Sequence, residues 1–279
     1  MAVNRFENSG GEGRADITAK AGAQGGMALL RRGRSFFERL WRRLGRQELA
    51  ILLSLLSASG VLLLFLSLAG EVVKGDTHVF DQAVLLALRG SGDPADPLGP
   101  RWLELTARDI TSLGGYPVVI LMTLCAIGFL MIAAKGHAAV LVLVSIGGGM
   151  LLSSGLKDLF GRPRPDLVPH AVQVFTQSFP SGHATLSAVT YLTLGALLAR
   201  VQPRRAVKVY LLSLAVLLTL LVGASRVYLG VHWPTDVLAG WCVGAGWAVL
   251  CWAAASWLQQ RGEIEKDVER GSGATTTKS

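Results

Sequence analysis

The chain has 279 residues, of which 51% are hydrophobic and only 16% are charged, and its mean hydropathy is +0.45. A soluble domain carries about a quarter charged residues, and here the apolar residues are gathered in long uncharged blocks. This composition argues against a soluble globule, a disordered chain and a fibrous repeat. The net charge of +8 is typical of membrane proteins whose charged loops face anionic headgroups, so a nucleic-acid partner is not expected.

Two segments precede the first apolar block. Residues 1–26 are rich in glycine and in charges of both signs, which predicts a disordered N-terminal segment. Residues 27–48 alternate Arg with Leu, Phe and Trp at helical spacing. This basic amphipathic juxtamembrane segment is either a helix lying in the headgroup layer or a charge cluster that fixes the topology.

Six stretches are long enough, or nearly so, to cross a hydrocarbon core of about 30 Å as helices. They occupy residues 49–69, 114–134, 138–156, 181–199, 209–225 and 237–258. The sequence therefore predicts an all-α integral membrane domain over residues 49–258, built as a bundle of six transmembrane helices. Residues 259–279 are polar and are predicted to form a flexible cytoplasmic tail.

The segment between the first two spans, residues 70–113, is the longest predicted outer connection. An amphipathic run at residues 79–88 predicts a short helix on the outer face, and the sequence GSGDPADPLGP predicts a loop after it. We expect the Asp and Arg side chains of this segment to form solvated surface.

Three cysteines, Cys125, Cys242 and Cys251, lie inside the apolar blocks. They are too few for a disulfide framework and are not spaced as ligands of a tetrahedral metal site. We interpret them as small buried hydrophobic side chains.

The distribution of Lys and Arg between the connecting segments predicts the topology. With the N-terminus inside, 19 of the 27 basic residues lie on the inner side and 8 on the outer side. The inner segments are 1–48, 135–137, 200–208 and 259–279, and the outer segments are 70–113, 157–180 and 226–236. This bias predicts a multi-pass protein of the plasma membrane with both termini in the cytoplasm.

Polar residues flank matching ends of the predicted spans. In an up-and-down bundle, odd helices end and even helices begin on the same face, here the predicted extracytoplasmic face. The residues are Lys157, Arg162 and Arg164 after the third span, Ser181, Gly182 and His183 opening the fourth, Arg226 closing the fifth, and His232 and Asp236 introducing the sixth. We expect them to form one site.

The charges of this group indicate an anion. Lys157, Arg164 and Arg226 have no excess of acids nearby, and guanidinium groups offer forked donors to phosphate oxygens. Ser181 and Gly182 open a helix, where backbone N–H groups and the positive end of the helix dipole bind anions. The residues therefore predict a phosphate site.

A metal ion is not expected at this site. The clustered Asp, Glu and His side chains that Mg²⁺ or Zn²⁺ requires are absent, so we predict that the cations replace a metal and that no cofactor is used. Arg162 is a weaker candidate for a second contact with the headgroup.

The two histidines predict divided roles. Asp236 follows His232 by four residues, and a carboxylate bonded to one ring nitrogen leaves the other nitrogen as a directed nucleophile. His183 has no carboxylate close by in the sequence and lies beside the anion site. It is placed to donate a proton to the departing oxygen.

Three motifs in order resemble the signature of the type 2 phosphatidic acid phosphatase superfamily. Residues 157–165 match K-x6-R-P, residues 180–183 match P-S-G-H, and residues 225–236 match S-R-x5-H-x3-D. The superfamily also contains vanadium haloperoxidases and bacterial acid phosphatases. No signature position departs from the pattern, and the resemblance with its six-span layout covers about residues 49–258.

The resemblance implies a metal-independent membrane phosphatase that passes through a phosphohistidine. It implies His232 as nucleophile, Asp236 as its orienting partner and His183 as general acid. The implied phosphate-binding residues are Lys157, Arg164, Ser181, Gly182 and Arg226. The covalent intermediate follows from the resemblance alone.

The predicted function is hydrolysis of a lipid phosphomonoester or diphosphate. Phosphatidate, phosphatidylglycerol phosphate and undecaprenyl diphosphate are the substrates that the resemblance implies, and lipid A or another headgroup is the alternative, for a phosphatase or a phosphotransferase. A haloperoxidase would need bound vanadium and would oxidise halide. A lipid or phosphate transporter on the same scaffold would have no need of the pair His232 and Asp236. The signature does not define the oligomeric state.

Overall fold

The computed structural model describes residues 46–90, 92–93, 95–166 and 176–260. The predictions for residues 1–26, for 27–45 of the basic segment and for 261–279 of the tail lie outside these ranges. The chain divides into two compact units, Met1–Leu52 and Leu53–Ser279. The first is described only from the start of helix α2, and the packing below belongs to the second.

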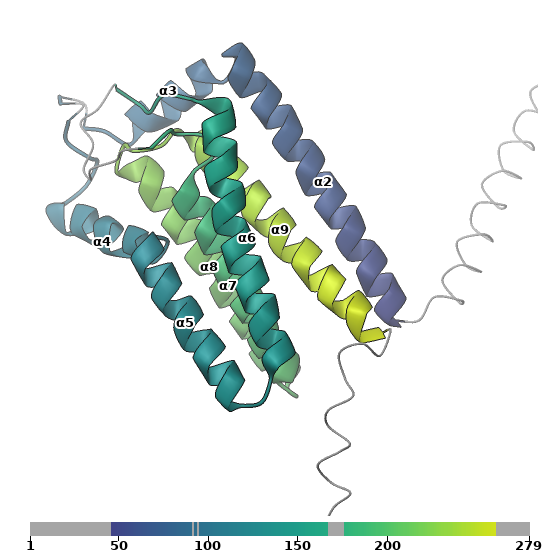
Figure 1. Ribbon diagram of the computed structural model, residues 1–279. Helices are drawn as coiled ribbons and strands as arrows, with labels where there is room; N and C mark the ends of the chain where they lie inside the picture. The colour runs from purple at the N-terminus through teal and green to yellow at the C-terminus, as the bar shows by residue number, and fades with distance from the viewer. Residues whose placement is uncertain (1–45, 91, 94, 167–175, 261–279) are drawn as a thin grey trace, which may run out of the picture. The chain divides into compact units, whose positions relative to one another are not determined.

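The described residues are helical apart from loops and one isolated bridge between Arg89 and Pro97. This confirms the predicted all-α class. The helices, labelled in Figure 1, are α2 (Arg46–Lys74), α3 (His78–Ala87), α4 (Arg101–Ser112), α5 (Tyr116–Ile132), α6 (Gly136–Phe160), α7 (Gly182–Val201), α8 (Arg205–Tyr228) and α9 (Pro234–Gln260).

Five of these helices, α2, α6, α7, α8 and α9, are long and apolar enough to cross a membrane. The remaining predicted span, residues 114–134, corresponds to α5, which has 17 residues. It meets that standard only together with α4, from which it is bent by 47°. The chain is thus a multi-pass membrane protein with five such helices, or six when the bent pair is counted as one span.

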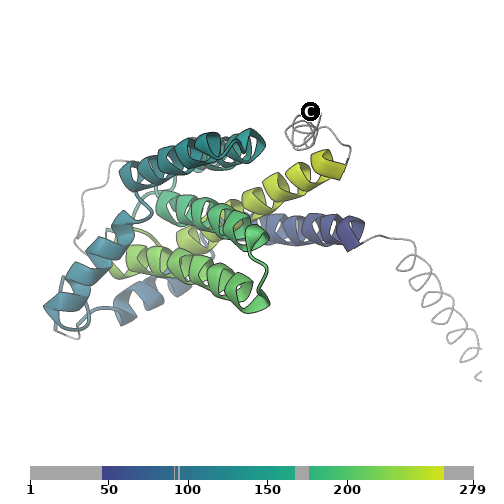
Figure 2. The ribbon, with the colours of Figure 1, turned by 90° about the horizontal axis from the view of Figure 1, so that it is seen from below.

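Helix α7 is the centre of the second unit and packs against α5, α6, α8 and α9. Figure 2 shows it between α6 and α8. Two glycines let α9 approach it closely. A Cβ at Gly240 would lie 2.7 Å from the carbonyl oxygen of Ser181, and one at Gly244 would lie 2.5 Å from that of Thr185. Any side chain at either position would separate the helices that begin at the predicted site.

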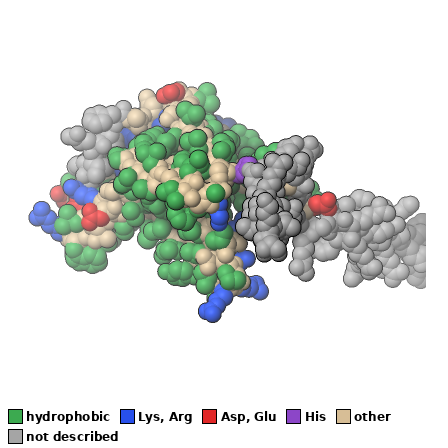
Figure 3. All heavy atoms as spheres, turned by 60° about the horizontal axis from the view of Figure 1, so that its bottom comes forward, with side chains coloured by type: hydrophobic (Ala, Val, Ile, Leu, Met, Phe, Trp, Pro, Cys, Tyr) green, Lys and Arg blue, Asp and Glu red, His purple; other side chains and the backbone are tan. Residues whose placement is uncertain are grey.

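Large apolar side chains on the outside of the helices are exposed, as membrane spans require. Leu56, Leu63, Ile132 and Leu151 are each about two-thirds or more exposed, with values of 70%, 67%, 90% and 77%. Hydrophobic side chains cover most of the described surface drawn in Figure 3, and the fewer Lys and Arg side chains lie mostly at its margins. Such an apolar surface is suited to contact with lipid tails.

The segment between the first two spans differs in part from the expectation. The predicted short amphipathic helix is present as α3, but a second helix, α4, follows the predicted loop at residues 101–112, where no helix was expected. The expectation of solvated Asp and Arg side chains is wrong for two residues. Asp81 is fully buried, and Arg89, only 7% exposed, donates from Nη2 to the carbonyl oxygen of Tyr228 at 2.9 Å.

Candidate active site

The helix ends carry the predicted site residues to one end of the bundle (Figure 1). Lys157 lies in the last turn of α6, and Arg226 in the last turn of α8. Gly161 ends α6 with φ +58°, the left-handed conformation that glycine adopts readily. Arg164 lies in the loop that follows. Ser181 precedes α7, which begins with Gly182 and His183, while His232 precedes α9 and Asp236 lies in its first turn.

The ring of His232 is held between a carboxylate and a guanidinium. Its Nδ1 lies 3.4 Å from Oδ2 of Asp236, and its Nε2 lies 3.0 Å from Nη1 of Arg164. Asp236 faces Nδ1, which favours the tautomer that carries its proton there. The lone pair is then on Nε2, the nitrogen beside Arg164.

Ser178 is a member of this cluster that the sequence analysis missed. Its hydroxyl donates to Oδ2 of Asp236 and lies 3.3 Å from Nδ1 of His232. The backbone N–H of Ser178 donates to the carbonyl oxygen of Arg162 at 2.9 Å, which ties the two loops together. Its one signal in the sequence is that it lies two residues before the P-S-G-H motif.

Two of the predicted phosphate-binding cations are directed by backbone carbonyl groups. Arg164 donates from Nε to the oxygen of Thr176 at 2.7 Å and from Nη1 to that of Val231 at 2.6 Å. Lys157 donates from Nζ to the oxygen of Gln177. These bonds hold the two cations against the loop that leads into α7.

Two of the predicted phosphate-binding residues carry a buried polar atom with no hydrogen-bond partner among the described residues: Nε of Arg226 and Oγ of Ser181. Arg226 is 3% exposed and donates from Nη1 to Oγ1 of Thr111 on α4 at 3.1 Å. Unsatisfied buried donors are costly, and an anion accepting from both would satisfy them.

The start of α7 differs in one detail from the predicted anion cradle. The backbone N–H of Ser181 donates to the carbonyl oxygen of Asp236 at 2.9 Å, so it is already used within the protein. The N–H groups at the start of a helix lack intrahelical partners, which leaves those of Gly182 and His183 for an anion. A Cβ at Gly182 would lie 3.4 Å from Cε of Lys157, so this backbone lies against the lysine side chain.

His183 is half-buried beside the break between α4 and α5. A Cβ at Gly115 would lie 3.6 Å from its Nε2, and one at Gly114 would lie 3.0 Å from its carbonyl oxygen. The two glycines let this break lie close to His183.

The guanidinium of Arg162, predicted as a weaker candidate for a headgroup contact, is bonded within the protein. Its Nη1 donates to Oδ1 of Asp236 at 2.7 Å, and its Nη2 donates to Oδ2 of Asp81 at 2.7 Å. Both terminal nitrogens are engaged by buried carboxylates. The sequence placed Arg162 near the site correctly but gave no sign of these partners.

The electrostatic environment keeps His232 neutral. Burial lowers the pKa of His232 well below its usual range, and the positive charges of Arg226, Arg164 and Lys157 lower it further. Burial also lowers the pKa of Arg164. A neutral imidazole keeps a lone pair on one ring nitrogen, which is what attack on phosphorus requires. Within the described ranges, no group of three or more His, Cys, Asp or Glu side chains is arranged to hold a metal ion.

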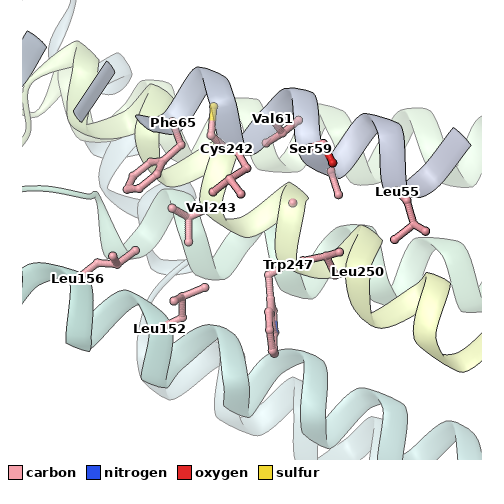
Figure 4. A pocket seen from close by; sticks show the side chains of 13 residues that line it. Leu55, Ser59, Val61, Phe65, Leu152, Leu156, Cys242, Val243, Trp247 and Leu250 are labelled. Carbon is pink, nitrogen blue, oxygen red and sulfur yellow. The ribbon is translucent and has the colours of Figure 1, made fainter. Parts of the chain in front are cut away.

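An apolar groove of about 290 Å³ lies between α2, α6 and α9 (Figure 4). Phe65 and Leu156 lie at one end of it and Leu55 and Leu250 at the other. The first end adjoins the site, because Leu156 precedes Lys157. The Phe65 ring also stacks on Phe179, two residues before Ser181, with centroids 6.0 Å apart.

Comparison with known proteins gives consistent matches. The profile of the PAP2 superfamily matches residues 138–260. Phosphatidylglycerophosphatase B of Bacillus subtilis is 32% identical over 185 residues, which cover 65% of this chain and 86% of the relative. An undecaprenyl-diphosphatase of Sulfolobus acidocaldarius is 43% identical over 68 residues, which cover 24% of this chain and 29% of the relative.

A solved structure also resembles this chain. The crystal structure of a transmembrane PAP2-type phosphatidylglycerolphosphate phosphatase from Bacillus subtilis matches with a TM-score of 0.65 and 28% identity. The match covers 76% of this chain and 98% of that one.

Proposed function

This chain belongs to the PAP2 superfamily and is a membrane lipid phosphate phosphatase, and from that premise we propose that it transfers the phosphoryl group of its lipid to His232. The observation that carries the proposal is the approach of Arg164 Nη1 to His232 Nε2, at 3.0 Å. A phosphoryl group bound to Arg164 meets the ring nitrogen that faces away from Asp236.

The reaction then has two steps. In the first, Nε2 of His232 forms a bond to phosphorus, the bond from phosphorus to the lipid oxygen breaks, and His183 gives a proton to that oxygen. In the second, water attacks phosphorus and gives a proton to His183, the bond from Nε2 to phosphorus breaks, and phosphate leaves with both histidines restored. Lys157, Arg164 and Arg226 are all close enough to interact with His183, and in this proposal the negative charge of the bound phosphate offsets the positive charges gathered there.

The phosphate oxygens are held in this proposal by cations and helix-start donors in place of a metal. The side chains of Lys157, Arg164 and Arg226 supply the charge. The hydroxyl of Ser181 and the N–H of Gly182 supply neutral donors. Such fixed donors stabilise charge that develops in the transition state, so activity is expected to survive excess EDTA and to be inhibited by vanadate.

We propose that the lipid tail lies in the apolar groove between α2, α6 and α9. The end of the groove at Leu156 and Phe65 is the end nearer the site, since Leu156 precedes Lys157 and Phe65 stacks on Phe179. The apolar lining of the groove supports a lipid tail as its occupant. Gly246→Phe would fill the groove, since Gly246 lines it. The loss in kcat/KM should be confined to long-chain substrates and absent for p-nitrophenyl phosphate. Gly155→Phe is the control, because open space surrounds a Cβ at Gly155.

The proposed substrate class is a glycerophospholipid phosphomonoester or a polyprenyl diphosphate, which the names of the two relatives support. The site is proposed to face away from the cytoplasm, which the excess of basic residues in the predicted inner segments supports. Lipid A is the alternative headgroup. Transport without hydrolysis and halide oxidation with bound vanadium are the other activities to be tested.

The deciding experiment measures phosphate release by the purified protein in detergent. Phosphatidylglycerol phosphate, undecaprenyl diphosphate, phosphatidate and lipid A are compared by kcat/KM, each with and without EDTA. His232→Ala should abolish release, whereas His137→Ala should not, because His137 lies at the opposite end of α6 from Lys157. Equal release by wild type and His232→Ala, or loss on chelation that Mg²⁺ restores, contradicts the proposal.

A further inference from the structure

Asp81, a buried carboxylate outside the three motifs, connects the segment after α2 to the start of α9. It lies in the first turn of α3 and is fully buried. Its Oδ1 accepts from the backbone N–H of Thr235 at 3.0 Å, and its Oδ2 accepts from Oγ1 of Thr235 at 2.7 Å and from Nη2 of Arg162 at 2.7 Å. Both oxygens are engaged, as a buried charge requires.

Arg162 is held between two carboxylates as a result. Besides Asp81, it binds Oδ1 of Asp236 at 2.7 Å and Oγ1 of Thr235 at 2.8 Å, both through Nη1. The Arg162 side chain is 7% exposed. Its charge is therefore shared between one acid on α3 and one acid at the start of α9.

The two bonds of Arg162 determine which partner each oxygen of Asp236 faces. Oδ1 of Asp236 faces Arg162, while Oδ2 accepts from the N–H of Trp233 at 2.9 Å and faces Nδ1 of His232. A guanidinium fork binds both oxygens of a carboxylate when nothing restrains it. Without the charge of Asp81, Nη2 of Arg162 is left with the neutral hydroxyl of Thr77, at 3.3 Å. Arg162 can then take both oxygens of Asp236 and compete with His232.

We propose that Asp81 is a positioning residue for phosphoryl transfer. By holding Nη2 of Arg162, it confines Arg162 to one oxygen of Asp236 and leaves the other oxygen to orient the ring of His232. The effect passes through two side chains, and the bonds of Asp81 go to Arg162 and Thr235, not to the phosphate-binding cations. The inference rests on the proposed role of His232 as nucleophile.

The test is Asp81→Asn, which keeps the size of the side chain and an oxygen for the N–H of Thr235. We expect kcat to fall about 10- to 100-fold, the range typical of partners that orient a metal-bound histidine, while KM and the inhibition constant of inorganic phosphate change by less than about twofold. The control Asp76→Asn removes an exposed carboxylate five residues away and should leave kcat unchanged. A parallel loss of affinity for inorganic phosphate and of kcat would show that Asp81 only supports the fold, and would overturn the proposal.

A double-mutant cycle separates positioning from independent damage. In a background of Asp236→Asn, Asp81→Asn should reduce kcat by less than about threefold more, because its route to His232 is already broken. If the double variant loses kcat by the full product of the two single-variant losses, the proposal is contradicted.

Rapid quenching distinguishes failure of this inference from failure of the proposed function. Wild type should form a phosphoenzyme, and Asp81→Asn should form it more slowly. If wild type forms none, the role of His232 as nucleophile is wrong. If both proteins form it at one rate, the role of His232 stands and the role of Asp81 is wrong.

Discussion

Gly240→Ala tests whether the close approach of α7 and α9 sets the geometry of the site. A Cβ at Gly240 would lie 2.7 Å from the carbonyl oxygen of Ser181 and 2.9 Å from Cβ of Ala184. Ordinary contact begins near 3.4 Å, so the start of α7 must move by about 0.7 Å relative to α9. Ser181 immediately precedes α7 and His183 lies in its first turn, whereas Asp236 lies in the first turn of α9 and His232 just before it.

The displacement therefore separates the proposed acid and phosphate donors from the nucleophile. A misplacement of about 1 Å can cost about 100-fold in rate, so we expect kcat to fall about 10- to 100-fold. Overpacking costs about 1–3 kcal/mol of stability, and the better helix propensity of Ala returns about 1 kcal/mol. The net loss is small enough for the protein to fold.

The assay compares kcat, KM and Tm of Gly240→Ala with those of Gly155→Ala. Gly155 lies on α6, and a Cβ there meets open space, so this control should keep the kcat of wild type with an equal or higher Tm. A wild-type kcat for Gly240→Ala would refute the reasoning, because it would show that the helix separation does not set the site geometry.

Three further predictions concern the proton, the pH profile and the topology. His183→Asn should slow the burst of alcohol release from phosphatidate by about 10²–10⁴-fold. The burst of nitrophenolate release from p-nitrophenyl phosphate should slow far less, because nitrophenolate leaves without a proton. Equal slowing of both bursts would make His183 a binding residue. Burial and the neighbouring cations lower the pKa of His232, so its ring becomes neutral at a lower pH than usual. The acid limb of kcat/KM, corrected for ionisation of the substrate, should therefore have its midpoint below pH 6.5. A midpoint above that value counts against a neutral nucleophile. In a cysteine-free background, Asp166→Cys should react with a membrane-impermeant thiol reagent in intact cells or spheroplasts, while Lys135→Cys should react only after the membrane is opened; the reverse pattern would invert the topology.

The sequence was informative for properties that depend on the type and order of residues along the chain. Apolar length predicted the spans, and the parity of the helix ends predicted that residues as far apart as Lys157 and Asp236 belong to one end of the bundle. In the structure Arg164 and Asp236 do lie on opposite sides of the ring of His232. Their chemical roles remain predictions.

The sequence was uninformative where burial depends on a partner far along the chain. Asp81 and Arg162 are 81 residues apart, and an isolated Asp in an amphipathic helix resembles a surface residue until its partner is known. Helix α4 was missed because its charged residues follow a Gly/Pro-rich stretch that indicates a loop. The unpaired Nε of Arg226 and the used N–H of Ser181 also depend on packing and have no signal in the sequence.

The most direct test of the central claim is to identify the phosphorylated atom. A lipid substrate with a radiolabelled phosphate is mixed with the enzyme, the reaction is quenched within the first turnover in alkali, and the labelled peptide is mapped. The account predicts an acid-labile phosphohistidine at His232, bonded through Nε2, because Nδ1 faces Asp236. Label on another residue, or turnover with no labelled protein in wild type at any quench time, would contradict it.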